Sequence, residues 1–424
     1  MSAAPKSSCY PRWGRRSGRR LVIGCVTLAV SAASALVAVP AEAAPPGASE
    51  PSLTAQATTF TVSGAGYGHG RGMSQYGAYG AASQGKSWTQ ILDFYYPKTK
   101  RALQKDKSNI KVWITADDDN DLRVLPAKGL RVFDERSHSY TLPTGSGYRA
   151  WRITRKGSGY SLARLDTDGK WKTQTTSLGT TTWTFSNSAN VVKVWAPTGA
   201  RRELRGTVAL VKRGSGGRTV NRLRMEDYLR GVVPAEMPTS WSTEAVRAQS
   251  VAARSYAARL QSAASSSRGY DVCDTTSCQV YRGLASTRDG RRTVYETKDG
   301  NAAIKATART ILKYGKAIVL TEFASSNGGA TAASGLAYQV EKKDPYDDVI
   351  GSRSWTKKVT AATVARGWSS VGTVEKLQVT ARDGSGRWGG RVTKIKIMGS
   401  KKTITVTGSS FQSRLGLRST LFHL

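Results

Sequence analysis

The chain has 424 residues, of which 39% are hydrophobic, and a net charge of +35 at pH 7. This composition supports a full hydrophobic core, and the length allows one large domain or two smaller ones. So large a charge indicates a polyanionic setting, but the chain lacks the interleaved aromatic and basic signature of an RNA-binding protein.

Residues 1–44 have the three-part layout of a secretory signal peptide. Arginines at positions 12 to 20 precede an apolar run, 21–39, which is followed by Ala41-Glu42-Ala43. An uncleaved membrane anchor is the alternative, since the run approaches spanning length. The many small residues and the A-x-A pattern favour cleavage. We therefore expect a protein secreted or held in the cell wall, without a permanent membrane span.

Export also bears on the partner of the positive charge. It argues against nucleic acid and favours anionic wall polymers or membrane surfaces. The alternative is that the charge only keeps the protein soluble.

Residues 45–58 are rich in Pro, Ala, Ser and Thr and are predicted to be a flexible leader. In the next segment, 59–100, the stretch 64–80 is dense in glycine and includes Gly68-His69-Gly70. Such density predicts close backbone approaches or positive φ angles, in a tight packed loop or in a segment that lines a substrate site. Ser87-Trp-Thr-Gln90 has the spacing of a capping box, and Tyr95-Tyr96-Pro97 should end the helix that it starts.

Short apolar stretches separated by turn residues predict a series of β-strands over 110–220, so 101–204 is expected to form a β-rich subdomain. Four tryptophans recur there, and packing of the sheets is a simpler role for them than stacking on sugars. They are Trp151, Trp171, Trp183 and Trp195.

A short helix is predicted from Met225, stopped by Gly231 and Pro234. Glu236 should then lie in a loop between Pro234 and Pro238, before a second helix from Ser242 to about Leu260. The alanines of this second helix form a narrow face for tight packing, and Arg247 and Arg254 share another face.

The cysteines outside the signal segment form one close pair, Cys273 and Cys278. In an oxidising compartment a disulfide is expected, with a metal site as the alternative. The chain has three histidines, too few for a local zinc cluster, so zinc would need distant ligands.

Glu236 is the sharpest candidate for chemistry. Flanking prolines restrict its backbone, and the apolar neighbours Val232, Val233, Met237 and Trp241 would raise its pKa. A helix cap or a surface charge is the ordinary alternative for a lone glutamate. The sequence ties no second carboxylate to it, which speaks against a two-acid hydrolase.

Several runs resemble the stage II sporulation protein D/LytB family. The longest is VNRLRMEDYLRGVVPAEMPTSWSTEAVRAQSVAARSYA, which begins at Val220. Others are YDVCDTTSCQVYRG, FASSNGGAT, DPYD, FQSRLGLRST and GYGHGRGMSQYGA. The glycine-rich element comes last in the family but first here, so the chain resembles a circular permutant. Permutation requires that residues near Thr59 and near Leu424 be neighbours.

The resemblance implies an α+β fold, with a mixed β-rich core and helices around a central groove. Residues 205–424 would form the catalytic core, completed by 59–100. It implies Glu236 as the catalytic acid and Arg254 as a residue that positions substrate or a carboxylate. Further residues would line the sugar groove: His69, Ser74, Gln75, Arg247, Gln249, Tyr256, Gln279, Tyr281, Ser325 and Ser326.

The implied reaction is lytic transglycosylation of peptide-stripped peptidoglycan strands, without a cofactor, although some relatives bind zinc near the cysteine pair. Two other functions fit the same resemblance. One is a non-catalytic amidase enhancer, which would bind the wall or a cell-wall amidase. The other is a muramidase that admits water.

Overall fold

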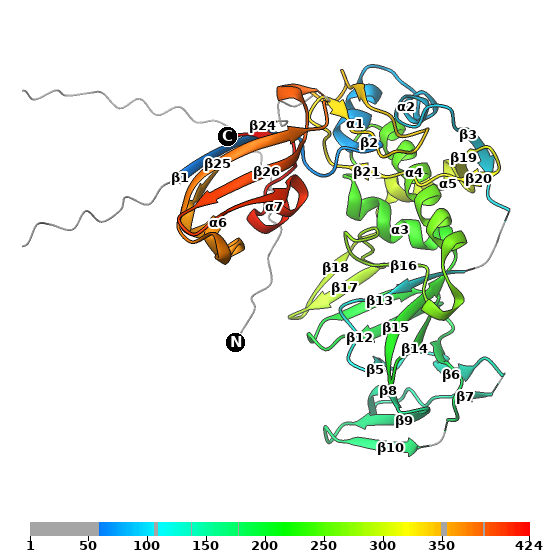
Figure 1. The fold of residues 1–424 in the computed structure, drawn as a ribbon. Helices are drawn as coiled ribbons and strands as arrows, with labels where there is room; N and C mark the ends of the chain where they lie inside the picture. The colour runs from blue at the N-terminus through cyan, green and yellow to red at the C-terminus, as the bar shows by residue number, and fades with distance from the viewer. Residues whose placement is uncertain (1–58, 106–108, 137, 177, 349–353, 385) are drawn as a thin grey trace, which may run out of the picture. The chain divides into compact units, whose positions relative to one another are not determined.

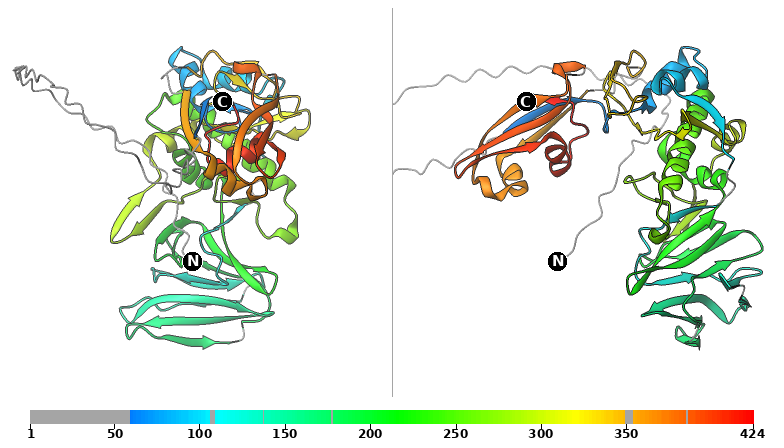
Figure 2. Two further views of the ribbon diagram at one scale, coloured as in Figure 1. Left: turned by 60° about the vertical axis from the view of Figure 1, so that its left-hand side comes forward. Right: turned by 45° about the vertical axis from the view of Figure 1, so that its right-hand side comes forward.

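The computed structural model describes residues 59–424 except 106–108, 137, 177, 349–353 and 385 (Figure 1). The predicted signal peptide, 1–44, and leader, 45–58, lie outside the described residues. The predicted β-series is confirmed as two large sheets, drawn from cyan to yellow-green in Figures 1 and 2. Together with helices that pack beside them, these sheets make the fold α+β.

The first sheet has seven strands and the second has eight. In spatial order the first contains β16 (Val272–Cys273), β4 (Ile110–Trp113), β15 (Gly216–Leu223), β14 (Thr207–Arg213), β11 (Trp183–Ser186), β6 (Arg131–Asp134) and β7 (Ser139–Thr141). The second contains β10 (Trp171–Thr175), β9 (Gly159–Asp166), β8 (Tyr148–Lys156), β5 (Asp121–Val124), β12 (Val191–Trp195), β13 (Arg201–Arg205), β17 (Ala285–Arg288) and β18 (Arg291–Val294).

One of these sheets crosses the predicted boundary between residues 204 and 205, and the division itself stays a prediction. Strand β14 pairs with β11 and β15 pairs with β4, so strands from both sides of the boundary share one sheet. The backbone groups of β4 pair only with strands from beyond that boundary, whereas β11 pairs with β14 across it and with β6 on its own side. Trp151 and Trp183 are buried as predicted, and the indole N–H of each donates to a main-chain carbonyl.

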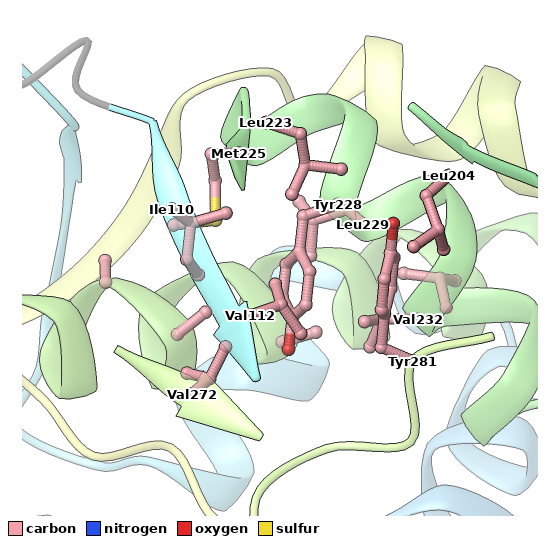
Figure 3. Packing of buried hydrophobic residues seen from close by; sticks show 14 of the residues in the cluster. Ile110, Val112, Leu204, Leu223, Met225, Tyr228, Leu229, Val232, Val272 and Tyr281 are labelled. Atoms are coloured by element: carbon pink, nitrogen blue, oxygen red, sulfur yellow. The ribbon is translucent and has the colours of Figure 1, made fainter. Parts of the chain in front are cut away.

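Helices α3 (Met225–Glu236), α4 (Thr243–Ala263) and α5 (Lys298–Ala306) pack together beside the seven-stranded sheet. The alanine face of α4 is confirmed: Ala245, Ala248 and Ala252 are fully buried. Small side chains let the neighbouring backbones approach α4 closely. Tyr228 and Tyr281 lie side by side in the resulting core, with ring centroids 5.2 Å apart (Figure 3).

The predicted end of α3 was wrong, because the helix continues through Gly231 and Pro234 to Glu236. A proline in the last turn removes one helical N–H, but the Met237 N–H still donates to the Val233 carbonyl at 3.0 Å. Gly231 serves close packing instead. A Cβ there would lie 2.7 Å from the Tyr281 ring, and its carbonyl accepts from the Arg282 N–H at 3.1 Å.

The glycine-rich segment is only partly a loop. Gly66, Gly68, Gly70 and Gly72 all have positive φ angles, which side chains other than glycine rarely adopt. From Gln75 the chain forms a helix, α1 (Gln75–Ser83), because the Ser74 hydroxyl caps its start by accepting from the Gly77 N–H. The predicted capping box is confirmed at the start of α2 (Trp88–Tyr95), and the helix ends at Tyr95 as predicted.

A second hydrophobic cluster is built mainly from the C-terminal part of the chain. Its sheets are β24 (Ser354–Thr360), β1 (Thr59–Ala65) and β28 (Phe422–His423), and β25 (Val374–Arg382), β26 (Val392–Gly399) and β27 (Thr403–Thr407). Helices α6 (Ala361–Gly367) and α7 (Gly408–Leu415) pack with them. Ser63 and Gly64 pair with His423 and Phe422. The expected proximity of residues near Thr59 and near Leu424 is thus confirmed, whereas the permutation itself stays a prediction.

Smaller pairings complete the description. The parallel pair β2 (Met73–Ser74) and β21 (Phe323–Ala324) joins the glycine-rich segment to the middle of the chain. The remaining strands are β3 (Lys100–Leu103), β19 (Thr310–Tyr314), β20 (Ala317–Ile318), β22 (Ala330–Thr331) and β23 (Lys342–Lys343). Among the described residues, no helix combines the length and the apolar character needed to cross a membrane.

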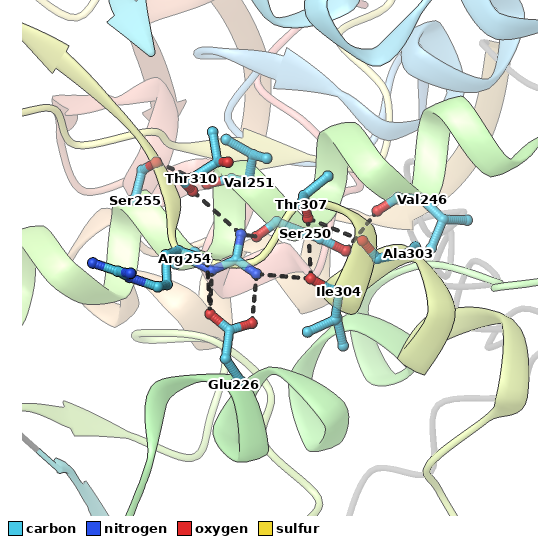
Figure 4. A network of polar contacts seen from close by, with 11 residues as sticks. Glu226, Val246, Ser250, Val251, Arg254, Ser255, Ala303, Ile304, Thr307 and Thr310 are labelled. Carbon is cyan, nitrogen blue, oxygen red and sulfur yellow. Dashed lines mark hydrogen bonds and ion pairs between the residues drawn. The ribbon is translucent and has the colours of Figure 1, made fainter. Parts of the chain in front are cut away.

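Arg254 ties α3 to α4 and α5 (Figure 4). Its side chain is completely buried, and its guanidinium forms a bidentate pair with Glu226 at 2.9 and 2.7 Å. It also donates to the carbonyls of Ile304 and Thr310 at 3.3 and 3.2 Å. A buried guanidinium needs this full set of acceptors, so Arg254 supports the helices.

We expect Arg254→Leu to lower the free energy of unfolding by about 3 kcal/mol, because the substitution removes the buried cation that pairs with Glu226 and donates to two carbonyls. Arg247→Leu is the matched control on the same helix, since the Arg247–Glu244 pair is partly exposed, and it should cost less than about 1 kcal/mol. Urea denaturation measures both. Equal losses would show that the buried pair has no special role.

Candidate active site around Glu236

Glu236 is the last residue of α3, where three segments distant in sequence meet. Its Oε1 accepts a hydrogen bond from the Val280 N–H at 2.6 Å. Its main-chain carbonyl accepts from Nε2 of Gln75, the first residue of α1, at 3.0 Å. Within the described chain, Oε2 takes no protein hydrogen bond, and the residue is only partly exposed. One carboxyl oxygen is thus anchored and the other is free to contact a ligand.

The surroundings of Glu236 favour its protonated form. Burial raises the pKa of this carboxyl above its ordinary value, and the Val280 N–H and the charge of Arg282 offset only part of that effect. The carboxyl also lies at the C-terminal end of a helix, where the partial charge is negative. A protonated carboxyl in such a place can act as a general acid.

Gln75 and Gln249 form a buried amide pair behind Glu236. Gln75 Nε2 lies 3.5 Å from Gln249 Oε1, a long contact, and Gln249 is fully buried on α4. Because Gln75 bonds the backbone of Glu236, it positions the carboxyl and does not itself face solvent. The structure thus brings together Glu236, Gln75 and Gln249, but both glutamines are buried, so the prediction that they line a sugar groove is corrected to a supporting role.

The segment 279–283 runs along α3 and carries Val280 to Glu236. Gln279 Oε1 accepts from the Tyr228 hydroxyl at 3.1 Å, and the Tyr281 hydroxyl donates to Asn221 Oδ1 at 2.7 Å. Both Gln279 and Tyr281 are buried. They therefore hold the Val280 N–H in place, and the prediction that they contact sugar is corrected to this supporting role.

The two arginines of α4 that were predicted to contact substrate, Arg254 and Arg247, have protein partners instead. Arg254 has no exposed side-chain surface, so it cannot contact substrate in this structure. Arg247 pairs with Glu244 at 2.6 Å, and Glu244 in turn accepts from the Trp88 N–H at 2.8 Å at the start of α2. The face of α4 that carries Arg247 and Arg254 therefore packs against other helices. Arg254 pairs with Glu226 of α3, and Arg247 pairs with Glu244, which accepts from the start of α2.

The hydroxyl of Tyr256 is influenced by two carboxyl groups, those of Glu322 and Glu236. Burial raises the pKa of its hydroxyl, and the charges of Glu322 and Glu236 raise it further. Sequence reasoning missed Glu322, which precedes the quoted FASSNGGAT run but belongs to no motif that suggests chemistry. Burial acts to raise the pKa of Glu322, but bonds from Arg71 at 2.9 and 2.6 Å outweigh it and leave this pKa lowered. Glu322 is therefore ionised at neutral pH.

His69 belongs to the same group as Arg71 and Glu322. Burial, aided by the charge of Arg71, lowers the pKa of His69 to about 4, so the ring is neutral near pH 7. Its Nδ1 accepts from the Arg71 N–H at 3.0 Å. His69 therefore shapes the glycine-rich loop, and its predicted contact with sugar stays a prediction.

Ser74 and Ser326 share a carboxylate partner that the sequence did not single out. Both serine hydroxyls donate to Asp347, as do the N–H groups of Gly328 and Gly329. Both serines are buried, so this network supports the loop and the prediction that they face sugar is corrected. The Ser325 carbonyl accepts from the Tyr76 N–H at 3.0 Å, and Ser325 is partly exposed.

Cys273 and Cys278 are bonded to each other, with Cα atoms 5.5 Å apart. Within the ranges described, no group of three or more His, Cys, Asp and Glu side chains could hold a metal ion.

The predicted central groove is not confirmed. One hollow of the surface lies among α1, α2 and Tyr346, and another lies beside β24 and residues 416–418. Glu236 lines neither of them.

Comparison with known proteins places this site in a family. The model of the stage II sporulation protein family, SpoIID, matches residues 213–314, which contain Glu236, α4 and the disulfide. The amidase enhancer of Bacillus subtilis (strain 168) is 39% identical over 134 residues, 30% of this chain and 16% of that protein. Stage II sporulation protein D of the same strain is 29% identical over 226 residues, 49% of this chain and 62% of that protein.

Stage II sporulation protein D of Bacillus amyloliquefaciens is 31% identical over 221 residues, 48% of this chain and 61% of that protein. The matches therefore span less than two thirds of each of these relatives. The family model covers the region that carries Glu236, and residues 213–314 of this chain are therefore a domain of the stage II sporulation protein (SpoIID) family.

Proposed function

We propose that this chain is an exported lytic transglycosylase that cleaves peptide-stripped peptidoglycan strands, with Glu236 as its sole acid and base. The observation that carries the proposal is the state of the Glu236 carboxyl. One oxygen is anchored by the Val280 N–H, the other is free, and the pKa is raised. Membership in the SpoIID family supports a role at the cell wall.

The reaction needs one carboxyl and no cofactor. Protonated Glu236 gives its proton to the oxygen that links C1 of N-acetylmuramic acid to N-acetylglucosamine, and the C1–O bond breaks. The 6-hydroxyl oxygen of the same muramic residue then bonds C1, and its proton returns to the Glu236 carboxylate. The products are a 1,6-anhydro end and a free 4-hydroxyl, and the acid is regenerated. Proximity of the 6-hydroxyl makes a protein nucleophile unnecessary.

The second carboxyl near Tyr256 does not suit a two-acid hydrolysis. Glu322 is held by both oxygens in its pair with Arg71, so its charge is already neutralised. A water-activating base would need a free oxygen directed at the substrate. This favours internal attack over a water-using muramidase.

A non-catalytic amidase enhancer is the second candidate, favoured by the 39% identity to the amidase enhancer of Bacillus subtilis. In that case the chain would bind the wall or a cell-wall amidase without cutting glycan. The strong positive charge suits anionic wall polymers in either case. The reaction products separate the functions: anhydro ends indicate a transglycosylase, reducing ends a muramidase, and uncut strands an enhancer.

Glu236→Gln should abolish the release of anhydro-muropeptides, lowering the rate by at least about 100-fold, because glutamine cannot donate the proton. Peptide-stripped and intact strands are incubated with each protein, and mass spectrometry identifies the ends. Glu375→Gln, an exposed position on β25, should leave the rate unchanged. Equal release by wild type and Glu236→Gln would exclude Glu236 as the acid.

The raised pKa of Glu236 also predicts how stability depends on pH. The folded protein binds the Glu236 proton more tightly than the unfolded chain does. The contribution of the protonated carboxyl to the free energy of unfolding is therefore fully present below the unfolded pKa, about 4.3, and is lost as pH rises through the folded pKa. Glu236→Gln removes this loss. Urea denaturation across this pH range should therefore show the variant gaining on wild type as pH rises, whereas a constant difference would contradict the raised pKa.

Gln75→Leu should lower the cleavage rate roughly 10-fold, because the Glu236 backbone loses the hydrogen bond that positions it. Gln84→Leu, at the exposed end of the same helix, is the control and should not change the rate. Steady-state kinetics should show the loss in kcat more than in KM. A loss confined to KM would instead make Gln75 a substrate contact.

A further inference from the structure

Three aromatic side chains gather on the two segments that meet at Glu236, namely α1 and the turn that follows α3. Trp241 packs against Tyr76 and Tyr79 of α1, with ring centroids 5.0 and 4.8 Å apart and interplanar angles of 42° and 37°. Positions 76 and 79 are one helical turn apart, so both tyrosines lie on one face of α1. All three residues keep part of their surface exposed. We call these three residues the aromatic cluster.

The cluster is attached to the candidate acid from both sides. Gln75, which bonds the Glu236 carbonyl at 3.0 Å, directly precedes Tyr76. Trp241 follows Glu236 by five residues, and its N–H donates to the Pro238 carbonyl at 3.2 Å, which closes a tight turn. Both segments that carry the cluster are therefore tied by hydrogen bonds within a few residues of Glu236.

The cluster differs from the aromatic residues of the core. Trp151 and Trp183 are 2% and 1% exposed, and the indole N–H of each is satisfied by a main-chain carbonyl. Trp241 is partly exposed, and its indole N–H has no hydrogen-bond partner within the described residues. A tryptophan with one apolar face and an unused donor is typical of a binding surface.

We propose that the aromatic cluster is a sugar subsite that stacks on a pyranose ring of an N-acetylated amino sugar next to the scissile bond. This inference rests on the proposed function. The apolar C–H face of the ring would cover the aromatic surface, and the indole N–H would donate to an N-acetyl carbonyl. The cluster contains no cationic side chain, so it suits a neutral sugar better than a phosphate-rich polymer.

The test measures glycan binding by calorimetry in the Glu236→Gln protein, so that no cleavage occurs. The probes are a β-1,4-linked tetramer of N-acetylglucosamine and peptide-stripped peptidoglycan strands. Tyr79→Leu and Trp241→Leu keep apolar volume but remove a ring, and each should weaken binding about 10-fold. Tyr140→Leu is the matched control, because Tyr140 is 50% exposed and stacks on Trp183 at 5.8 Å.

Thermal denaturation of each variant separates lost binding from lost folding. If Trp241→Leu does not fold, the glycan affinity of Tyr79→Leu tests the subsite. Unchanged affinity in Tyr79→Leu, with the parent protein still binding glycan, would overturn the subsite and leave the proposed function standing. Equal weakening in Tyr140→Leu would also overturn it. Failure of the parent protein to bind either probe would refute the proposed function and the subsite together.

Discussion

The position of helix α3 is the constraint on which the site depends. At its start, Glu226 is held by the buried guanidinium of Arg254. At its end, the carbonyl of Glu236 is held by Gln75 and its carboxyl by the Val280 N–H. A carboxyl at the negative end of a helix, partly out of water, keeps its proton more readily than one in solvent. The fold thus fixes both the place and the protonation of one acid.

Most residues that resemble the family's site support Glu236 from behind. Gln279 and Tyr281 anchor the segment that presents Val280, while Ser74 and Ser326 converge on Asp347. These side chains are buried and fully occupied by protein partners. Sequence similarity at these buried residues therefore reflects how Glu236 is supported as much as contact with a ligand. For this reason, similarity to the family does not by itself separate an enzyme from an enhancer.

The glycine-rich segment links distant parts of the chain to that site. Its positive φ angles let the backbone run against residues 324–328, and the following helix carries Gln75, Tyr76 and Tyr79 to Glu236. Strand β1, which leads into this segment, pairs with β28 near the C-terminal end. Local backbone geometry at four glycines thereby determines which side chains stand beside the acid.

Elements with strong local signals were predictable from the amino-acid sequence. These are the β-series over 110–220, the capping box at Ser87, the alanine face of α4 and Glu236 as the candidate acid, because periodicity, capping and motif similarity depend on neighbouring residues. It misplaced the end of α3, since proline and glycine usually stop a helix and only tertiary packing against 279–283 shows otherwise. The pairing of Glu322 with Arg71, the role of Asp347 as partner of Ser326, and the burial of Arg254 became visible only in the tertiary structure. Each depends on contacts between segments dozens to hundreds of residues apart, for which a single sequence carries no spacing rule.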